Sequence, residues 1–274
     1  MGALLGLIGA LGIGLSDLFG RRIVLASSPL TAAVVMQLAG GLLAAVTMLA
    51  LPSEWLWSDA LRGIVSGVGM GVGLGCYYTG LARSTSTIVA PLVATLSAVL
   101  PFGYVLVASG GGSILGSVAS LVAVVGLALV SGGADAVSNV ADGVRWGVAS
   151  GLGYGVAIAV LTDVSADSGA WPAVTQRASA FVLLAAVGLA ARRAVVPPPG
   201  TRTSAVLAGA FVAVTSIALL IGVQFDAGAA VITLSMFPAF SVAIGRTFFG
   251  DPIRPRQAAG IGIVLAGVAG VVAG

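Results

Sequence analysis

The sequence predicts an all-α polytopic membrane protein with ten transmembrane helices, arranged as two inverted five-helix repeats. Of its 274 residues, 58% are hydrophobic and only 8% are charged, about a third of the charged fraction of a typical soluble domain. Apolar runs of about 20 residues, the length that spans a bilayer, follow one another from end to end. Weak internal similarity at a nearly constant offset points to duplication.

Charged or turn-forming residues separate the apolar segments. The expected helices are residues 2–20, 29–51, 61–82, 86–108, 114–132, 144–161, 172–191, 204–224, 228–249 and 256–273. Ten passes leave about 27 residues for each, so no separate soluble domain is expected. The first segment lacks a basic leader and is too long for a signal core, which predicts that it is retained.

Three matches support the internal repeat. "LGIG" at residues 11–14 recurs as "LGYG" at 152–155, and Gly126 corresponds to Gly267, both at an offset of 141. "TLS" at 95–97 recurs at 233–235, an offset of 138. We therefore expect two halves, residues 1–137 and 138–274. Because each half crosses the membrane five times, the second half is inverted, as in many secondary transporters whose site lies near the midplane.

The composition limits the kinds of functional site that the chain can form. The 12 basic residues are all arginines, histidine is absent, and Cys76 is the lone cysteine, which excludes a disulfide framework and a cysteine metal site. The stripe Gly63, Gly67, Gly71 and Gly75 predicts close helix packing, not a phosphate loop, because no strand or lysine accompanies it. We expect no enzyme activity, metal, cofactor or nucleic-acid partner; the expected partners are a small-molecule substrate and the lipid bilayer.

The C-terminal stretch "FFGDPIRPRQAAGIGIVLAGVAGVVAG" resembles the closing pattern of the EamA-like branch of the drug/metabolite transporter superfamily. The matching positions are Gly250, Asp251, Gln257, Gly260 and Gly267. "TLSMFPAF" is similar to that family's proline-bearing ninth helix. The resemblance spans the chain, but Asp251 replaces the usual Glu and the first half has "GGG" there. It implies a multi-pass transporter of the bacterial cytoplasmic membrane, often an exporter; a homodimer is compatible with it.

The stretch "GIGLSDLFGRR" at residues 12–22 places a carboxylate inside the first apolar segment. Asp17 lies about 22 Å along a helix from Gly2, within a hydrocarbon core of about 30 Å. Intramembrane ionisable groups are costly and are therefore functional candidates. Arg21 follows at i+4, the favourable order for an ion pair. The sequence leaves two interpretations open, a pair with Arg21 or a protonatable acid that lines a cavity.

Other polar side chains lie within the apolar segments. The substrate-cavity candidates are Asp17, Gln37, Tyr77, Tyr78, Thr95, Tyr154, Gln176, Arg177, Thr215 and Ser235. Arg177 is expected either to snorkel to the interface or to meet a substrate carboxylate. The tyrosine rings could stack on a solute, whereas the Thr and Ser hydroxyls could bond to their own helices. Pro91, Pro101 and Pro238 are expected to kink helices at a cavity or gate.

These observations favour a secondary transporter of a small organic solute, such as an amino acid, metabolite or drug, that works by alternating access. Transport is expected to be passive or ion-driven, with Asp17 as the first proton-coupling candidate, followed by Asp226 and Asp163. A non-transporting scaffold and a channel are the alternatives. Arginine bias towards the odd-numbered connections predicts both termini outside, whereas the family resemblance implies both inside.

Overall fold

The computed structural model describes residues 1–50, 52–84, 86–108, 118–119, 121–122, 124–126, 129, 140–250 and 255–273. These residues form helices, turns and short connections, with no strand among them. The α-helices are α1 (Gly2–Ala26), α2 (Pro29–Thr47), α3 (Trp57–Arg83), α4 (Ser86–Ala108), α6 (Val140–Ala159), α7 (Trp171–Ala190), α8 (Arg202–Leu234), α9 (Phe237–Phe249) and α10 (Pro255–Ala273). The expected fifth segment, 114–132, lies largely outside the described residues.

Five of the described segments are long and apolar enough to cross a membrane. They are Gly2–Ala26, Pro29–Thr47, Trp57–Gly80, Trp171–Ala190 and Pro199–Leu234. Shorter apolar helical stretches are Thr95–Ala108 and Ala239–Phe249. The all-α membrane class is therefore supported by the structure, while the count of ten spans stays a prediction.

The expected eighth and ninth segments are joined differently from the prediction. α8 continues to Leu234, but the backbone of Asp226 leaves the helical region, with φ −164° and ψ 98°. The Asp226 carboxylate accepts a hydrogen bond from the Ala229 N–H at 2.9 Å, which caps the resumed helix. The chain turns again at Ser235 and Met236, directly before α9. Pro238 lies in the first turn of α9, where its missing N–H costs nothing.

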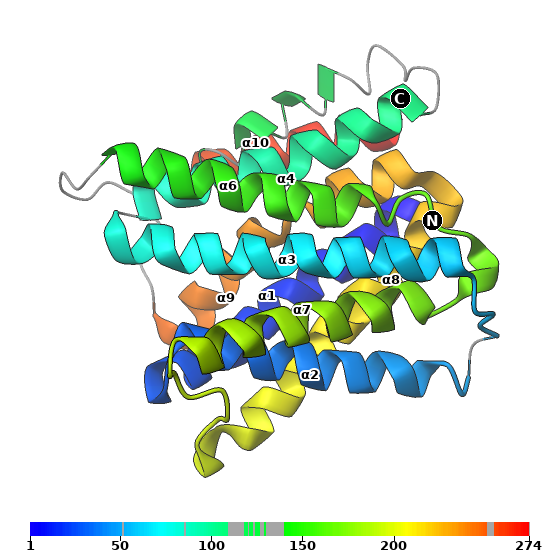
Figure 1. The fold of residues 1–274 in the computed structure, drawn as a ribbon. Helices are drawn as coiled ribbons and strands as arrows, with labels where there is room; N and C mark the ends of the chain where they lie inside the picture. The colour runs from blue at the N-terminus through cyan, green and yellow to red at the C-terminus, as the bar shows by residue number, and fades with distance from the viewer. Residues whose placement is uncertain are drawn as a thin grey trace.

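The helices pack in a pattern that repeats along the chain (Figure 1). α1 packs against α8 and α9, as α6 packs against α3 and α4. α2 packs against α8 as α7 packs against α3, and α2 and α7 also contact each other. The pattern therefore stays the same when α1 is exchanged with α6, α2 with α7, α3 with α8, and α4 with α9. Both chain ends lie at the same end of the helices, on the right in Figure 1.

Glycines bring neighbouring helices into backbone contact. A Cβ added to Gly153 of α6 would lie 2.7 Å from the carbonyl oxygen of Gly69 of α3. Gly63 and Gly67 approach the backbone of α7 in the same close manner, Gly71 faces the Leu183 side chain of α7, and Gly75 faces open space. The sequence-predicted packing stripe is thus confirmed over three of its four members.

Four hydroxyl groups tie two of these helix pairs together. Between α3 and α6, Ser66 Oγ donates to the Ala157 carbonyl at 2.5 Å, and Ser150 Oγ donates to Gly73 at 2.8 Å. Between α1 and α8, two further hydroxyls do the same at 3.1 and 2.9 Å, from Ser16 to Ala208 and from Thr215 to Gly9. Small hydroxyl residues commonly join membrane helices in this way.

Candidate functional site

A cluster of buried polar side chains lies where α2, α3, α7 and α8 meet. We call it the central polar cluster; its members are Gln37, Ser66, Gln176, Arg177 and Ser216, each at most 5% exposed. Most of them come from the interior of their helices. Polar groups at such a depth are expensive unless they are hydrogen-bonded, and they mark functional positions in membrane proteins.

Arg177 is at the centre of this cluster, and its guanidinium group is fully hydrogen-bonded. Its Nη1 donates to Gln37 Oε1 at 2.8 Å and to Met70 Sδ at 3.0 Å. Its Nε and Nη2 both donate to Ser216 Oγ, and Nη2 also donates to the Val212 carbonyl at 3.4 Å. Arg177 therefore points into the helix bundle, which disfavours the interfacial alternative raised by the sequence.

Gln176 extends the cluster to α3. Its Nε2 donates to Ser66 Oγ at 2.6 Å, and its Oε1 accepts from Ser216 Oγ at 3.4 Å. Gln37 Nε2 donates to Met70 Sδ at 3.3 Å. The three predicted residues Gln37, Gln176 and Arg177 are thus brought into one network that crosses between the two halves of the chain.

The three predicted tyrosines lie beside this network. Tyr154 of α6 packs on Gly73 of α3. The rings of Tyr77 and Tyr78 are 5.7 Å apart and tilted by 55°. Tyr78 also packs against a buried cluster that contains Ala33 and Val34 of α2 and Leu184 of α7.

Asp17 lines a separate pocket between α1 and α9, which we call the α1–α9 pocket. It has a volume of about 230 Å³ and is lined by Gly14, Asp17, Leu18, Arg21, Ser241, Ile244, Gly245 and Phe249. Ser241 Oγ donates to Asp17 Oδ2 at 2.6 Å. The Arg21 guanidinium lies 4.0 Å from the centre of the Phe249 ring. The intrahelical Asp17–Arg21 ion pair is not formed among the described residues, and Asp17 faces the pocket.

Of the remaining predicted site residues, Thr215 and Ser235 bond to helix backbone in this structure. Thr215 Oγ1 bonds to α1 and to its own helix, Ser235 Oγ bonds to the Val231 carbonyl at 2.9 Å, and Thr95 is half-buried within α4. α4 runs as one helix through Pro91 and Pro101. The interruption near Pro238 lies at the turn before α9.

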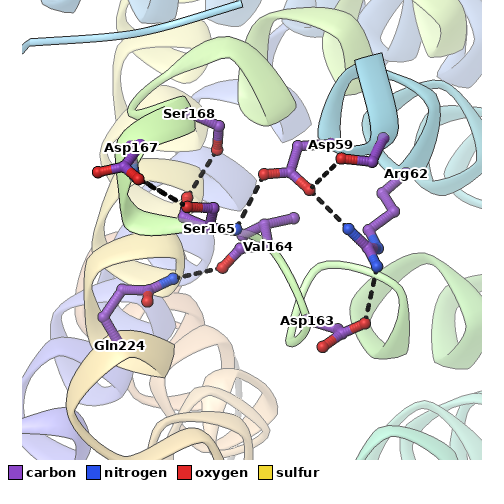
Figure 2. A network of polar contacts seen from close by, with 9 residues as sticks. Asp59, Arg62, Asp163, Val164, Ser165, Asp167, Ser168 and Gln224 are labelled. Atoms are coloured by element: carbon purple, nitrogen blue, oxygen red, sulfur yellow. Dashed lines mark hydrogen bonds and ion pairs between the residues drawn. The ribbon is translucent and has the colours of Figure 1, made fainter. Parts of the chain in front are cut away.

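A second polar network lies at the start of α3 and includes residues of the α6–α7 connection (Figure 2). Asp59, at the start of α3, is 1% exposed and accepts from Arg62 Nη1 at 2.6 Å and from the Ser165 N–H at 2.9 Å. Arg62 Nη2 donates to Asp163 Oδ2 at 2.8 Å. Gln224 of α8 donates to the Val164 carbonyl at 2.7 Å. We call Asp59, Arg62, Asp163 and Ser165 the polar clamp, because they join α3 to the α6–α7 connection.

Aromatic and backbone contacts reinforce the polar clamp. The ring of Trp55 lies edge-on to Trp57 and Trp171, at centroid distances of 5.1 and 4.5 Å. The Glu54 N–H donates to the Asp167 carbonyl at 2.8 Å. The α2–α3 and α6–α7 connections are therefore held together at this end, whereas the α1–α9 pocket lies towards the opposite end of α1.

Sequence reasoning missed several of these residues. Met70 lies in an apolar run and carries no pattern that would single it out. Ser66 sits within the glycine stripe, where the sequence indicated packing. Asp59 reads as an ordinary charge near a connection and Asp163 only as a weaker proton-coupling candidate, and the fold brings both to the same arginine.

Comparisons with known proteins establish the fold alone. No protein-family model matches the chain, and no curated protein matches its sequence. A solved structure described only as "Crystal structure of protein" superposes with a TM-score of 0.78 at 17% identity, covering 99% of this chain and 98% of that chain. The chain therefore shares a complete, experimentally observed fold, and its function must be argued from the site.

Proposed function

We propose that the protein is a secondary transporter that moves a small organic solute by alternating access between two five-helix halves, with export implied by the family resemblance. The observation that carries the proposal is the central polar cluster. It is buried within apolar helices and takes side chains from α2 and α3 of the first half and from α7 and α8 of the second. Transporters built from inverted repeats bind substrate at such a junction.

The hydroxyl bonds between helices support the proposed duplication. Ser16 and Ala157 are 141 positions apart, as are Gly9 and Ser150. Their partners across the helix contact lie 142 apart, Ser66 with Ala208 and Gly73 with Thr215. The two bonds between α3 and α6 are therefore repeated between α1 and α8, with donor and acceptor exchanged, and all four bonds join one half to the other. This agrees with the 141-residue offset of the sequence repeat and with the repeated packing pattern.

The two ends of the bundle differ in a way that suits alternating access. The polar clamp and the tryptophan contacts close one end, and the α1–α9 pocket opens towards the other. Glycine contacts bring α3 close to α6 and α7, and closely packed helices can make small sliding movements. A carrier requires such an exchange of open and closed ends.

A counterflow experiment tests the proposal. Purified protein is reconstituted into liposomes preloaded with an unlabelled solute, and entry of the labelled solute is followed. The panel contains amino acids, monocarboxylates, nucleosides and sugars, ranked beforehand by thermal stabilisation of the protein. Transient accumulation of at least one labelled solute is expected, since a carrier exchanges bound solute across the membrane.

The same experiment separates the two alternatives. A channel would give flux without transient accumulation, and a non-transporting scaffold would give neither for any member of the panel. Either result would contradict the carrier proposal. Empty liposomes provide the background. A protein carrying Arg62→Cys and Asp163→Cys in a Cys76→Ser background should lose counterflow when a short bis-methanethiosulfonate cross-linker joins the two thiols. It should regain counterflow on reduction, because the linker spans the gap that the arginine side chain bridges and holds the polar clamp shut.

A further inference from the structure

We infer that Arg177 and Gln37 bind the carboxylate group of a small organic acid, at the place that the Met70 sulfur occupies in this structure. The inference rests on the proposed transport function and names the chemical class of its solute. It follows from the charge of the central polar cluster and from the geometry around Met70.

Within the part of the chain that the structure describes, the positive charge of Arg177 has no negative partner. The side chain is 5% exposed, and a guanidinium group stays protonated in proteins. Its acceptors are the neutral oxygens of Gln37, Ser216 and Val212 and the sulfur of Met70. The described residues place no carboxylate within ion-pair distance of it. Because a buried charge is costly without an opposite charge, an anion entering the bundle would be strongly favoured here.

Two N–H donors converge on the Met70 sulfur. Arg177 Nη1 lies 3.0 Å from Sδ and Gln37 Nε2 lies 3.3 Å from it. A thioether is a weak acceptor, and methionine is an unbranched, adaptable side chain. An oxygen of a carboxylate at the same point would accept both hydrogen bonds, and the one from Arg177 would be charge-assisted and about twice as strong as a neutral bond. Met70 thus holds the position of an anionic oxygen and leaves it when the solute binds.

The balance of charge favours a monocarboxylate over a phosphate. The central polar cluster contains one positive charge, which one carboxylate neutralises. A phosphate monoester carries about −1.5 to −2 at neutral pH and would bring excess negative charge into the bundle. The ring of Tyr154, which packs on Gly73 one turn after Met70, provides an aromatic surface for the organic part of the solute.

Matched acid and amide probes test the inference on the wild-type protein in detergent. The pairs are benzoate with benzamide, L-lactate with L-lactamide, and L-phenylalanine with L-phenylalaninamide. The carboxylate of at least one pair should raise the apparent Tm. It should also bind at least tenfold tighter than its amide, a difference of about 1.4 kcal/mol. Equal stabilisation by acid and amide, or none by any acid, would overturn the inference.

Three variants assign the effect to the proposed residues. Arg177→Gln should abolish stabilisation by the acid, while Met70→Leu should retain it because both donors remain. Arg193→Gln, which removes an exposed arginine after α7, should also retain it. Stabilisation by the acid that survives Arg177→Gln would contradict the assignment. If Arg177→Gln does not fold, the acid–amide comparison on the wild-type protein still tests whether the protein binds a carboxylate.

The inference and the proposed function can fail independently. Counterflow of neutral solutes without binding of any carboxylate would refute the carboxylate site and leave the carrier proposal standing. Carboxylate binding by a protein that shows no counterflow would support the site and refute transport. Loss of both carboxylate binding and carboxylate counterflow in Arg177→Gln, with Arg193→Gln unaffected, would support both.

Discussion

Arg62 of the polar clamp pairs with two carboxylates in very different surroundings. The Asp59 side chain is 2% exposed and lies 2.6 Å from Arg62, whereas the Asp163 side chain is 58% exposed and lies 2.8 Å from it. Removing one partner of a buried pair typically costs about 3–5 kcal/mol, but an exposed pair contributes only about 0–1 kcal/mol. Since Arg62 itself is 35% exposed, we expect the lower end, about 3 kcal/mol, for Asp59→Asn.

The comparison is made by thermal unfolding of the purified variants at one scan rate. One kcal/mol shifts the Tm of a protein of 150–250 residues by roughly 2–4 °C. Asp59→Asn should therefore lower the apparent Tm by roughly 6–12 °C, and Asp163→Asn by at most roughly 4 °C. Asp59→Asn also places an amide N–H group near the Arg62 donors, so the double variant Asp59→Asn/Arg62→Gln should recover part of the loss. Equal shifts for the two single variants would refute the argument from burial.

Three other predictions concern coupling, packing and orientation. Asp17→Asn keeps an acceptor for Ser241 but removes the carboxylate, so counterflow should become independent of pH while the protein still folds; unchanged pH dependence would exclude Asp17 as the coupling acid. Gly153→Ala places a Cβ 2.7 Å from the Gly69 carbonyl and should cost about 1–3 kcal/mol, seen as a lower Tm, whereas Gly75→Ala should not destabilise the protein. A phosphatase fused to Gly274 should be active, which would place the C-terminus outside. Arg83 and Arg145 lie at the end of α3 opposite Arg62, and that end should be cytoplasmic because loop arginines stay cytoplasmic. A fluorescent, phosphatase-inactive fusion would reverse this orientation.

The helices could be predicted because their signals are local. Apolar length, turn residues and glycine spacing placed α2, α4, α7 and α10 within a few residues of their observed bounds. The break near residue 226 also appeared, as a boundary between two apolar segments, although the helix resumes at once because the Asp226 carboxylate caps it. Such features depend on neighbouring residues and need no knowledge of the fold.

The partners of the site residues could not be predicted in the same way. The sequence identified Gln37 and Arg177 as polar groups in apolar segments, but their hydrogen bond joins positions 140 residues apart. For Arg177, sequence position alone allowed an interfacial or an interior side chain, and the packing of α2 and α8 around α7 decided between them. Met70 belongs to the candidate site only because two donors from other helices converge on its sulfur. Contacts of this kind follow from tertiary structure.

The location of the tryptophans gives the protein an intrinsic optical probe. Of the four tryptophans in the chain, Trp55, Trp57 and Trp171 gather at the polar clamp, and Trp146 lies beside Arg83, at the other end of α3. In a Trp146→Phe protein, all indole emission would arise from the closed end of the bundle. Separation of the α2–α3 and α6–α7 connections would expose those rings and shift their emission to longer wavelength. The movement of one end could then be followed in real time, without an attached dye.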